Sequence, residues 1–86
     1  MPGAASGPSP VALDIRFVPP PERQPLALQC CTALEVGQWL LLISDHDPQP
    51  LHDQLRALHP GQFGWTLLEQ EPGVWRVRIT RLAIAG

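Results

Sequence analysis

The sequence predicts an α+β fold, a two-layer α/β sandwich in which two helices cover one face of a four-stranded mixed sheet. Its 86 residues suffice for one small domain, and 44 % of them are hydrophobic, which provides for a core. The first and last segments alternate apolar and polar residues, as half-buried strands do. Two segments with helical apolar spacing lie on either side of an apolar run, which gives the order βαβαββ.

The first strand is expected in "VALDIRF", after a tail. Residues 1–10, "MPGAASGPSP", can bury little apolar surface and are expected to be a disordered tail, with the folded domain over residues 11–82. The alternation places these side chains on the buried side of the strand: Val11, Leu13, Ile15 and Phe17. The prolines that follow end the strand because proline fixes φ and removes a donor.

A helix is expected from Glu22 to Leu34, since proline is tolerated in the first turn and Glu22 lies near the positive end of the helix dipole. Its apolar stripe contains Ala27, Cys30, Cys31 and Leu34. The next segment, "QWLLLIS", is apolar from Trp39 to Ile43. It is therefore expected to be the central strand, buried on both faces.

A second helix and a hairpin complete the predicted domain. Leucines at helical spacing mark one face of this helix: Leu51, Leu55 and Leu58. The segments "QFGWTLLE" and "VWRVRITR" alternate like strands and flank the turn pair "PG", so we expect an antiparallel hairpin. The first two strands are expected to pair in parallel through a right-handed crossover.

This architecture leaves one apolar surface uncovered. Two helices cover one face of the sheet, so alternate residues of the central strand must point away from them. The two possible sets are Trp39, Leu41 and Ile43, or Leu40 and Leu42. The patch is either an association surface for a partner protein or a homodimer, or it is shielded by arginine stems. The outward positions that would rim it are Asp14, Arg16, Arg76 and Arg78.

The overall composition disfavours several kinds of partner. The net charge is −2, so no nucleic acid is expected as a partner. No apolar run approaches the roughly 20 residues that span a membrane, and no signal peptide is apparent. Cys30 and Cys31 are adjacent and have no other cysteine to pair with, so we expect a reducing, cytoplasmic location. A small chain also favours a surface groove over an enclosed cavity.

Five motifs between Leu13 and Arg81 carry a resemblance to a known family: "LDIR", "PPPER", "DHDPQPL", "PGQFGW" and "VWRVRI". In this order and spacing they resemble the domain of unknown function family 2249, which is similar to the TusA/SirA-like sulfur-carrier proteins. The resemblance implies the same βαβαββ fold. It also implies association with hemerythrin-like domains and with nitrogen-oxide or anaerobic respiratory metabolism.

The resemblance also bears on mechanism. Sulfur carriers of that group have a Cys-Pro-x-Pro motif at the start of the first helix, where the helix dipole favours a thiolate. Matched without a gap up to Gly37, the motif falls on Pro20, Pro21, Glu22 and Arg23. Pro20 therefore replaces the cysteine, and the resemblance implies that this position carries no persulfide.

Arg23 and the "DHDP" loop are expected to be neighbours, because loops that follow parallel strands leave from the same edge of the sheet. The candidate residues for a partner or a small anion at this edge are Arg23, Asp45, His46, Asp47 and His52. Two structural roles remain open. One is an ion pair between Arg23 and an aspartate. The other is helix initiation, with Asp47 as the cap of the second helix and Pro48 as its first residue.

Three other functions are weighed from single residues. His46 and His52 are candidate ligands of a divalent metal or a haem, although their spacing matches no recognised site, and no cofactor is otherwise expected. A His–Asp acid–base pair has only Ser44 as a nearby nucleophile, which disfavours hydrolysis. Cys30 is the candidate for a sulfur relay. The sequence favours a non-catalytic cytosolic accessory domain that binds a partner protein or a small anionic ligand.

Overall fold

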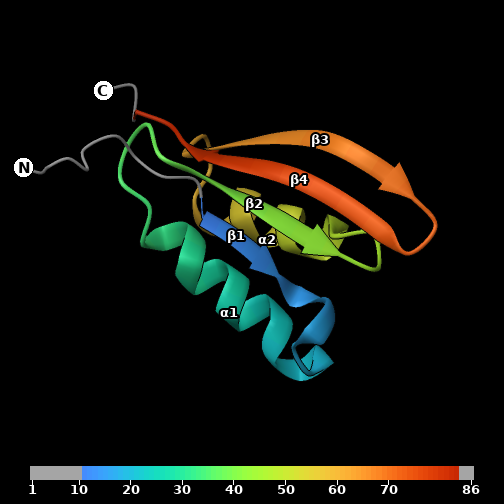
Figure 1. Ribbon diagram of the computed structural model, residues 1–86. Coiled ribbons are helices and arrows are strands. Elements are labelled where there is room, and N and C mark those ends of the chain that lie inside the picture. Colours follow the sequence, from blue (N-terminus) through green and yellow to red (C-terminus); the bar gives the residue numbers. More distant parts are fainter. Residues whose placement is uncertain (1–10, 84–86) are drawn as a thin grey trace, which may run out of the picture.

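The structure, a computed structural model, describes residues 11–83 and has the predicted βαβαββ order (Figure 1). Its elements are β1 (Val11–Asp14), the 3-10 turn η2 (Ile15–Phe17), α1 (Pro20–Thr32), β2 (Trp39–Ser44), α2 (Gln49–Leu58), β3 (Phe63–Glu71) and β4 (Val74–Arg81). The tail predicted for residues 1–10 lies outside the described residues. Among residues 11–83, no helix is long and apolar enough to cross a membrane.

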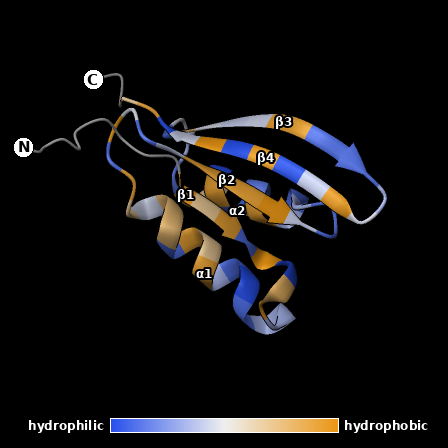
Figure 2. Cartoon of the chain, in the orientation of Figure 1, coloured by the Kyte–Doolittle hydropathy of each residue, from blue (hydrophilic) through white to orange (hydrophobic). Residues whose placement is uncertain are grey.

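The sheet is mixed, as predicted, with strand order β1-β2-β4-β3. β1 and β2 pair in parallel, whereas β4 is antiparallel to both β2 and β3. The apolar strand β2 therefore lies in the interior of the sheet. Figure 2 shows that most of β2 is hydrophobic, whereas β4 alternates. α1 and α2 lie on the same face of the sheet (Figure 1). The predicted fold class is confirmed.

The core lies between the sheet and the two helices. Leu40 and Leu42 of β2 oppose Ile79 and Val77 of β4, and all four are almost completely buried. The helices contribute Ala27, Cys31, Leu51 and Leu55 to the same cluster. Each fully buried Leu, Ile or Val side chain contributes about 1.5–3 kcal/mol to stability. The even-numbered leucines of β2 thus face the helices, and Trp39, Leu41 and Ile43 occupy the uncovered face.

The first strand is shorter than predicted. Asp14 ends β1, and its Oδ1 accepts a hydrogen bond from the main-chain N–H of Arg16 at 3.1 Å. The guanidinium of Arg16 returns two bonds to the same carboxylate, at 2.9 and 2.7 Å. These local bonds compete with strand pairing and turn the chain into η2. Phe17, predicted to be buried, is consequently 82 % exposed.

The helix boundaries also differ slightly from those expected. α1 begins and ends two residues earlier than predicted, at Pro20 and Thr32. α2 begins at Gln49, whose main-chain N–H donates to Asp47 Oδ1 at 3.0 Å. Asp47 therefore accepts a hydrogen bond from the first N–H group of α2, as expected of a capping residue. Pro48, expected to be the first helical residue, precedes the helix. Leu58 was expected on the buried face and is 56 % exposed, because α2 ends at this residue.

Candidate functional site

Arg23, in the first turn of α1, connects three parts of the chain. Its Nε donates to the carbonyl of Val18 at 2.7 Å, and its Nη2 donates to the carbonyl of Arg16 at 3.2 Å. Its Nη1 forms an ion pair with Asp45 Oδ1 at 3.0 Å. The "PPPER" and "DHDP" segments therefore lie together at one edge of the sheet, as the parallel crossover predicts.

Asp45 links this arginine to His46. The same Oδ1 that accepts from Arg23 lies 2.6 Å from His46 Nδ1. The hydrogen bond from His46 lowers the pKa of Asp45, burial opposes this, and the positive charge of Arg23 lowers it further. The side chain of His46 is 80 % exposed, so only its Nδ1 edge is held. Its main-chain N–H donates to Ser44 Oγ at 3.2 Å.

A surface cavity of about 410 Å³ opens beside this chain of contacts. It lies between the first turns of α1 and α2, at the carboxyl ends of β1 and β2, where open α/β sheets bind ligands. Its apolar lining consists of Ile15, Pro20, Ala27, Pro48, Pro50 and Leu51. Its polar lining consists of Arg23, Gln24, Ser44, His46 and Asp47. The volume falls within the range of about 300–1,000 Å³ typical of small-molecule sites.

The structure brings together some of the predicted site residues and separates others. Arg23, His46 and Asp47 line the cavity. Asp45 pairs with Arg23 but is not part of the lining, and His52 lines a different pocket. Ser44 was considered only as a nucleophile, yet it is 3 % exposed and lines the cavity. The signal for this role was its place at the end of a buried strand, where the side chain must face the helices.

Most main-chain donors at the two helix starts are absent or already bonded. α1 begins with two prolines, and the N–H of Glu22 donates to the carbonyl of Pro19 at 2.8 Å. At α2, the N–H of Gln49 bonds to Asp47, Pro50 has no N–H, and the next two N–H groups donate to the carbonyl of Pro48. Most of the usual anion-binding capacity of a helix N-terminus is therefore used within the chain.

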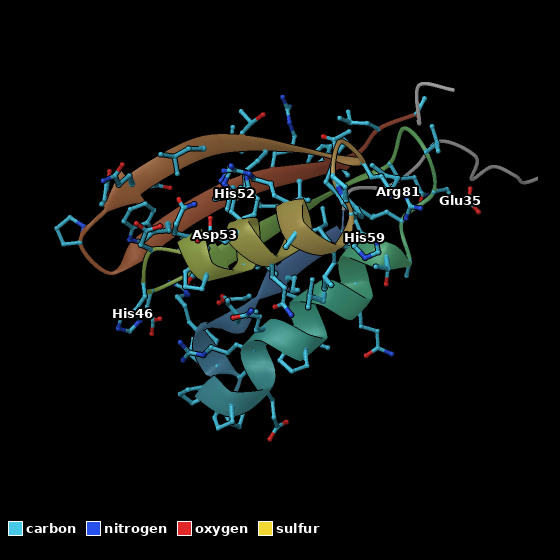
Figure 3. The ribbon with its side chains drawn as sticks, turned by 180° about the vertical axis from the view of Figure 1, so that it is seen from behind. Glu35, His46, His52, Asp53, His59 and Arg81 are labelled. Carbon is cyan, nitrogen blue, oxygen red and sulfur yellow. The ribbon has the colours of Figure 1, made fainter. Side chains whose placement is uncertain are left out.

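His52 lies against the sheet and not in the "DHDP" loop. Its ring stacks on Trp65, with centroids 4.2 Å apart and planes 2° from parallel. Burial lowers the pKa of His52, and the charge of Arg56 adds to this effect. Figure 3 shows His46 on the loop and His52 between α2 and the sheet, so the two candidate metal ligands are not brought together. Within residues 11–83, no three His, Cys, Asp or Glu side chains are grouped so as to hold a metal.

The two cysteines are unpaired and have different environments. Cys31 is completely buried, and burial, followed by the neighbouring Cys30, raises its pKa to about 12. At neutral pH its thiol is therefore protonated and a poor nucleophile. Cys30 is half-buried and lines a shallow groove beside Leu34 and Leu40. This groove is formed by the later part of α1 and the starts of β1 and β2, away from the helix N-terminus where thiolates are favoured.

A family comparison agrees with the sequence motifs. The model of a family described as uncharacterized conserved protein (DUF2249) matches residues 12–81, so the chain belongs to this family. No curated protein and no solved structure matches the chain.

Proposed function

We propose that this DUF2249 protein is a non-catalytic accessory domain that binds a partner protein through the cavity at the carboxyl ends of β1 and β2. The observation that carries the proposal is the cavity itself, about 410 Å³ with apolar walls and a few polar groups. This combination is characteristic of binding sites, in which apolar contacts supply affinity and polar groups fix orientation.

The polar groups around the cavity are held in place before anything binds. Arg23 is fixed by its three acceptors, and Asp45 holds both Arg23 and the Nδ1 edge of His46. A preorganised site loses less side-chain freedom when a partner binds, so more of the contact energy appears as affinity. This supports a binding role for the "PPPER" and "DHDP" segments in addition to their structural role.

The absence of an activated nucleophile beside the cavity supports a non-catalytic role. Within residues 11–83, Ser44 Oγ contacts His46 through the main-chain N–H, and no bond joins it to the imidazole ring. A nucleophilic serine needs a base within hydrogen-bond reach. Pro20 lines the cavity at the position where the resemblance places the cysteine of sulfur carriers.

We also propose a distant relationship to the TusA/SirA-like sulfur carriers, with the location of their reactive site retained and its chemistry lost. The βαβαββ order and the position of Pro20 at the cavity support this relationship. The proposed setting in nitrogen-oxide or anaerobic respiratory metabolism, together with hemerythrin-like domains, rests on the family resemblance.

The uncovered sheet face is the competing surface for a partner or a second copy of the chain. Its apolar residues Trp39, Leu41 and Ile43 are half-buried, although no helix covers them. The guanidinium of Arg78 lies 5.7 Å from the centre of the Trp39 ring, and Arg76 pairs with Glu69 across the hairpin. Arginine stems therefore shield this face, which favours the cavity as the site of binding.

Two adjacent prolines provide a matched test. Pro20 lines the cavity, whereas exposed Pro21 does not, and both lie in the first turn of α1. Pro20→Trp is expected to obstruct the cavity, and Pro21→Trp places the same bulk outside it. In quantitative pull-downs from native cytosol, a specific partner should be retained by the wild type and Pro21→Trp and lost by Pro20→Trp. Equal retention by all three proteins would exclude the cavity as the binding site.

A further inference from the structure

Ser44 provides the first clue to what the proposed binding site accepts. The residue is only 3 % exposed, and it lines the cavity. Ser44 Oγ accepts one hydrogen bond, from the main-chain N–H of His46, and it donates to no acceptor within residues 11–83. A buried hydroxyl with an unused donor favours an occupant that presents an acceptor oxygen.

Arg23 offers further donors without a net positive charge. Three of the five guanidinium N–H groups bond to Val18, Arg16 and Asp45, which leaves two without an acceptor within residues 11–83. Arg23 lines the cavity, so these two groups are candidate donors to an occupant. Asp45 balances the charge of Arg23. The arginine therefore resembles a neutral donor to an incoming group more than a free cation.

The surrounding charges disfavour an anion. The carboxylate of Asp47 is exposed and lines the cavity, so it repels negative charge. The first main-chain N–H groups of α2 are bonded within the chain. The first two residues of α1 are prolines, which have no N–H to offer. An anion would therefore meet an arginine that is already paired with Asp45 and a carboxylate, Asp47, that has no ion-pair partner within residues 11–83. An uncharged acceptor is not repelled.

His46 places a complementary acceptor at the rim. In the neutral tautomer that donates from Nδ1 to the carboxylate of Asp45, Nε2 is an acceptor. Apart from Gln24 and Asp47, the rest of the lining is proline and aliphatic side chains. Donors inside, an acceptor at the rim and apolar walls together match an apolar group that carries an amide.

We infer that the cavity receives an uncharged, apolar peptide segment of the partner, whose main-chain carbonyl accepts hydrogen bonds from Ser44 and Arg23 while its N–H faces His46. This inference rests on the proposed function, since it names the chemistry of the partner segment at the same cavity. It replaces the small anion expected from the sequence with a neutral amide as the preferred occupant.

Two probes of nearly the same shape separate the alternatives. N-acetyl-leucine methylamide is neutral, and N-acetyl-leucine carries a carboxylate. Each is titrated at millimolar concentration into the ¹⁵N-labelled full chain while the main-chain amide signals are recorded by NMR. The methylamide is expected to shift the signals of Ser44, His46 and Leu51 saturably, and to bind more tightly than the carboxylate.

Two variants and one control identify the contacts. Ser44→Ala should weaken methylamide binding roughly 2- to 10-fold, the range expected for one hydrogen bond. His46→Ala should weaken it as well, and because the side chain is exposed this variant should remain folded. Thr66→Ala removes an exposed hydroxyl from β3 and should leave binding unchanged. Dispersed amide signals establish that each variant is folded.

The outcomes distinguish failure of this inference from failure of the proposed function. Tighter binding of the carboxylate would overturn the amide inference and leave the cavity as a binding site. Binding that is insensitive to both Ser44→Ala and His46→Ala would also overturn it. If neither probe binds, the amide inference is overturned. The proposed function is then decided by the pull-down, in which Pro20→Trp must lose the partner.

Discussion

Arg23 holds the walls of the cavity together with a single guanidinium group. Its planar fork reaches two main-chain carbonyls and one carboxylate, a geometry that the compact ammonium of lysine does not reproduce. The pairing with an aspartate was predictable, because the crossover between parallel strands brings the loops after them together. The bonds from Arg23 to the carbonyls of Val18 and Arg16 were not predictable. The turn η2 positions these carbonyls, and η2 in turn depends on the local bonds between Asp14 and Arg16.

Removing the side chain of Arg23 should destabilise the protein measurably. Arg23→Ala is expected to lower the free energy of unfolding by about 1.5–3 kcal/mol, the range for hydrogen bonds to a charged group. Arg56→Ala, an exposed arginine of α2, serves as the control and should change it by less than about 0.5 kcal/mol. Urea denaturation followed by tryptophan fluorescence measures both. Similar decreases in unfolding free energy for the two variants would show that the bonds of Arg23 do not stabilise the fold.

Helices and strands are joined by contacts that periodicity alone does not reveal. Apolar spacing predicted where α2 lies, but the contact of α2 with β3 is completed by the stacking of His52 on Trp65. At the other end of the molecule, Arg81 Nη1 lies 3.3 Å from the carbonyls of Thr32 and Leu34, at the negative end of the α1 dipole. The pattern of leucines and valines predicts which elements form, whereas polar side chains fix how their ends meet.

The contact between α2 and β3 should make stability depend on pH. Burial and Arg56 lower the pKa of His52 in the folded protein, with Asp53 opposing, so the unfolded chain binds protons more readily. The stabilisation is therefore present above the unfolded pKa of about 6.5 and is lost as the pH falls through it toward the lower folded pKa. His52→Gln should reduce the decline in unfolding free energy between about pH 7.5 and pH 5.5. Parallel stability curves for the two proteins would refute this role of His52.

At the scale of the whole molecule, the fold was predictable and the cavity was not. Alternation, helical spacing and the apolar run of β2 each specify an element, and the short connections leave few topologies for those elements. The cavity instead arises where α1, α2 and the end of β2 approach without filling the space between them. Its lining residues share no pattern along the chain, so the sequence indicated the sheet edge and the inward direction of Ser44 but not the volume of the cavity.

The central claim is that the partner occupies this cavity and not the uncovered face of the sheet. The most direct measurement is NMR mapping of the captured partner, or of its binding segment, onto the ¹⁵N-labelled full chain. The account predicts that the largest changes in amide signals fall around the cavity, at Ser44, His46 and Leu51. Largest changes at Leu41, Ile43 and Arg78, on the uncovered sheet face, would contradict it.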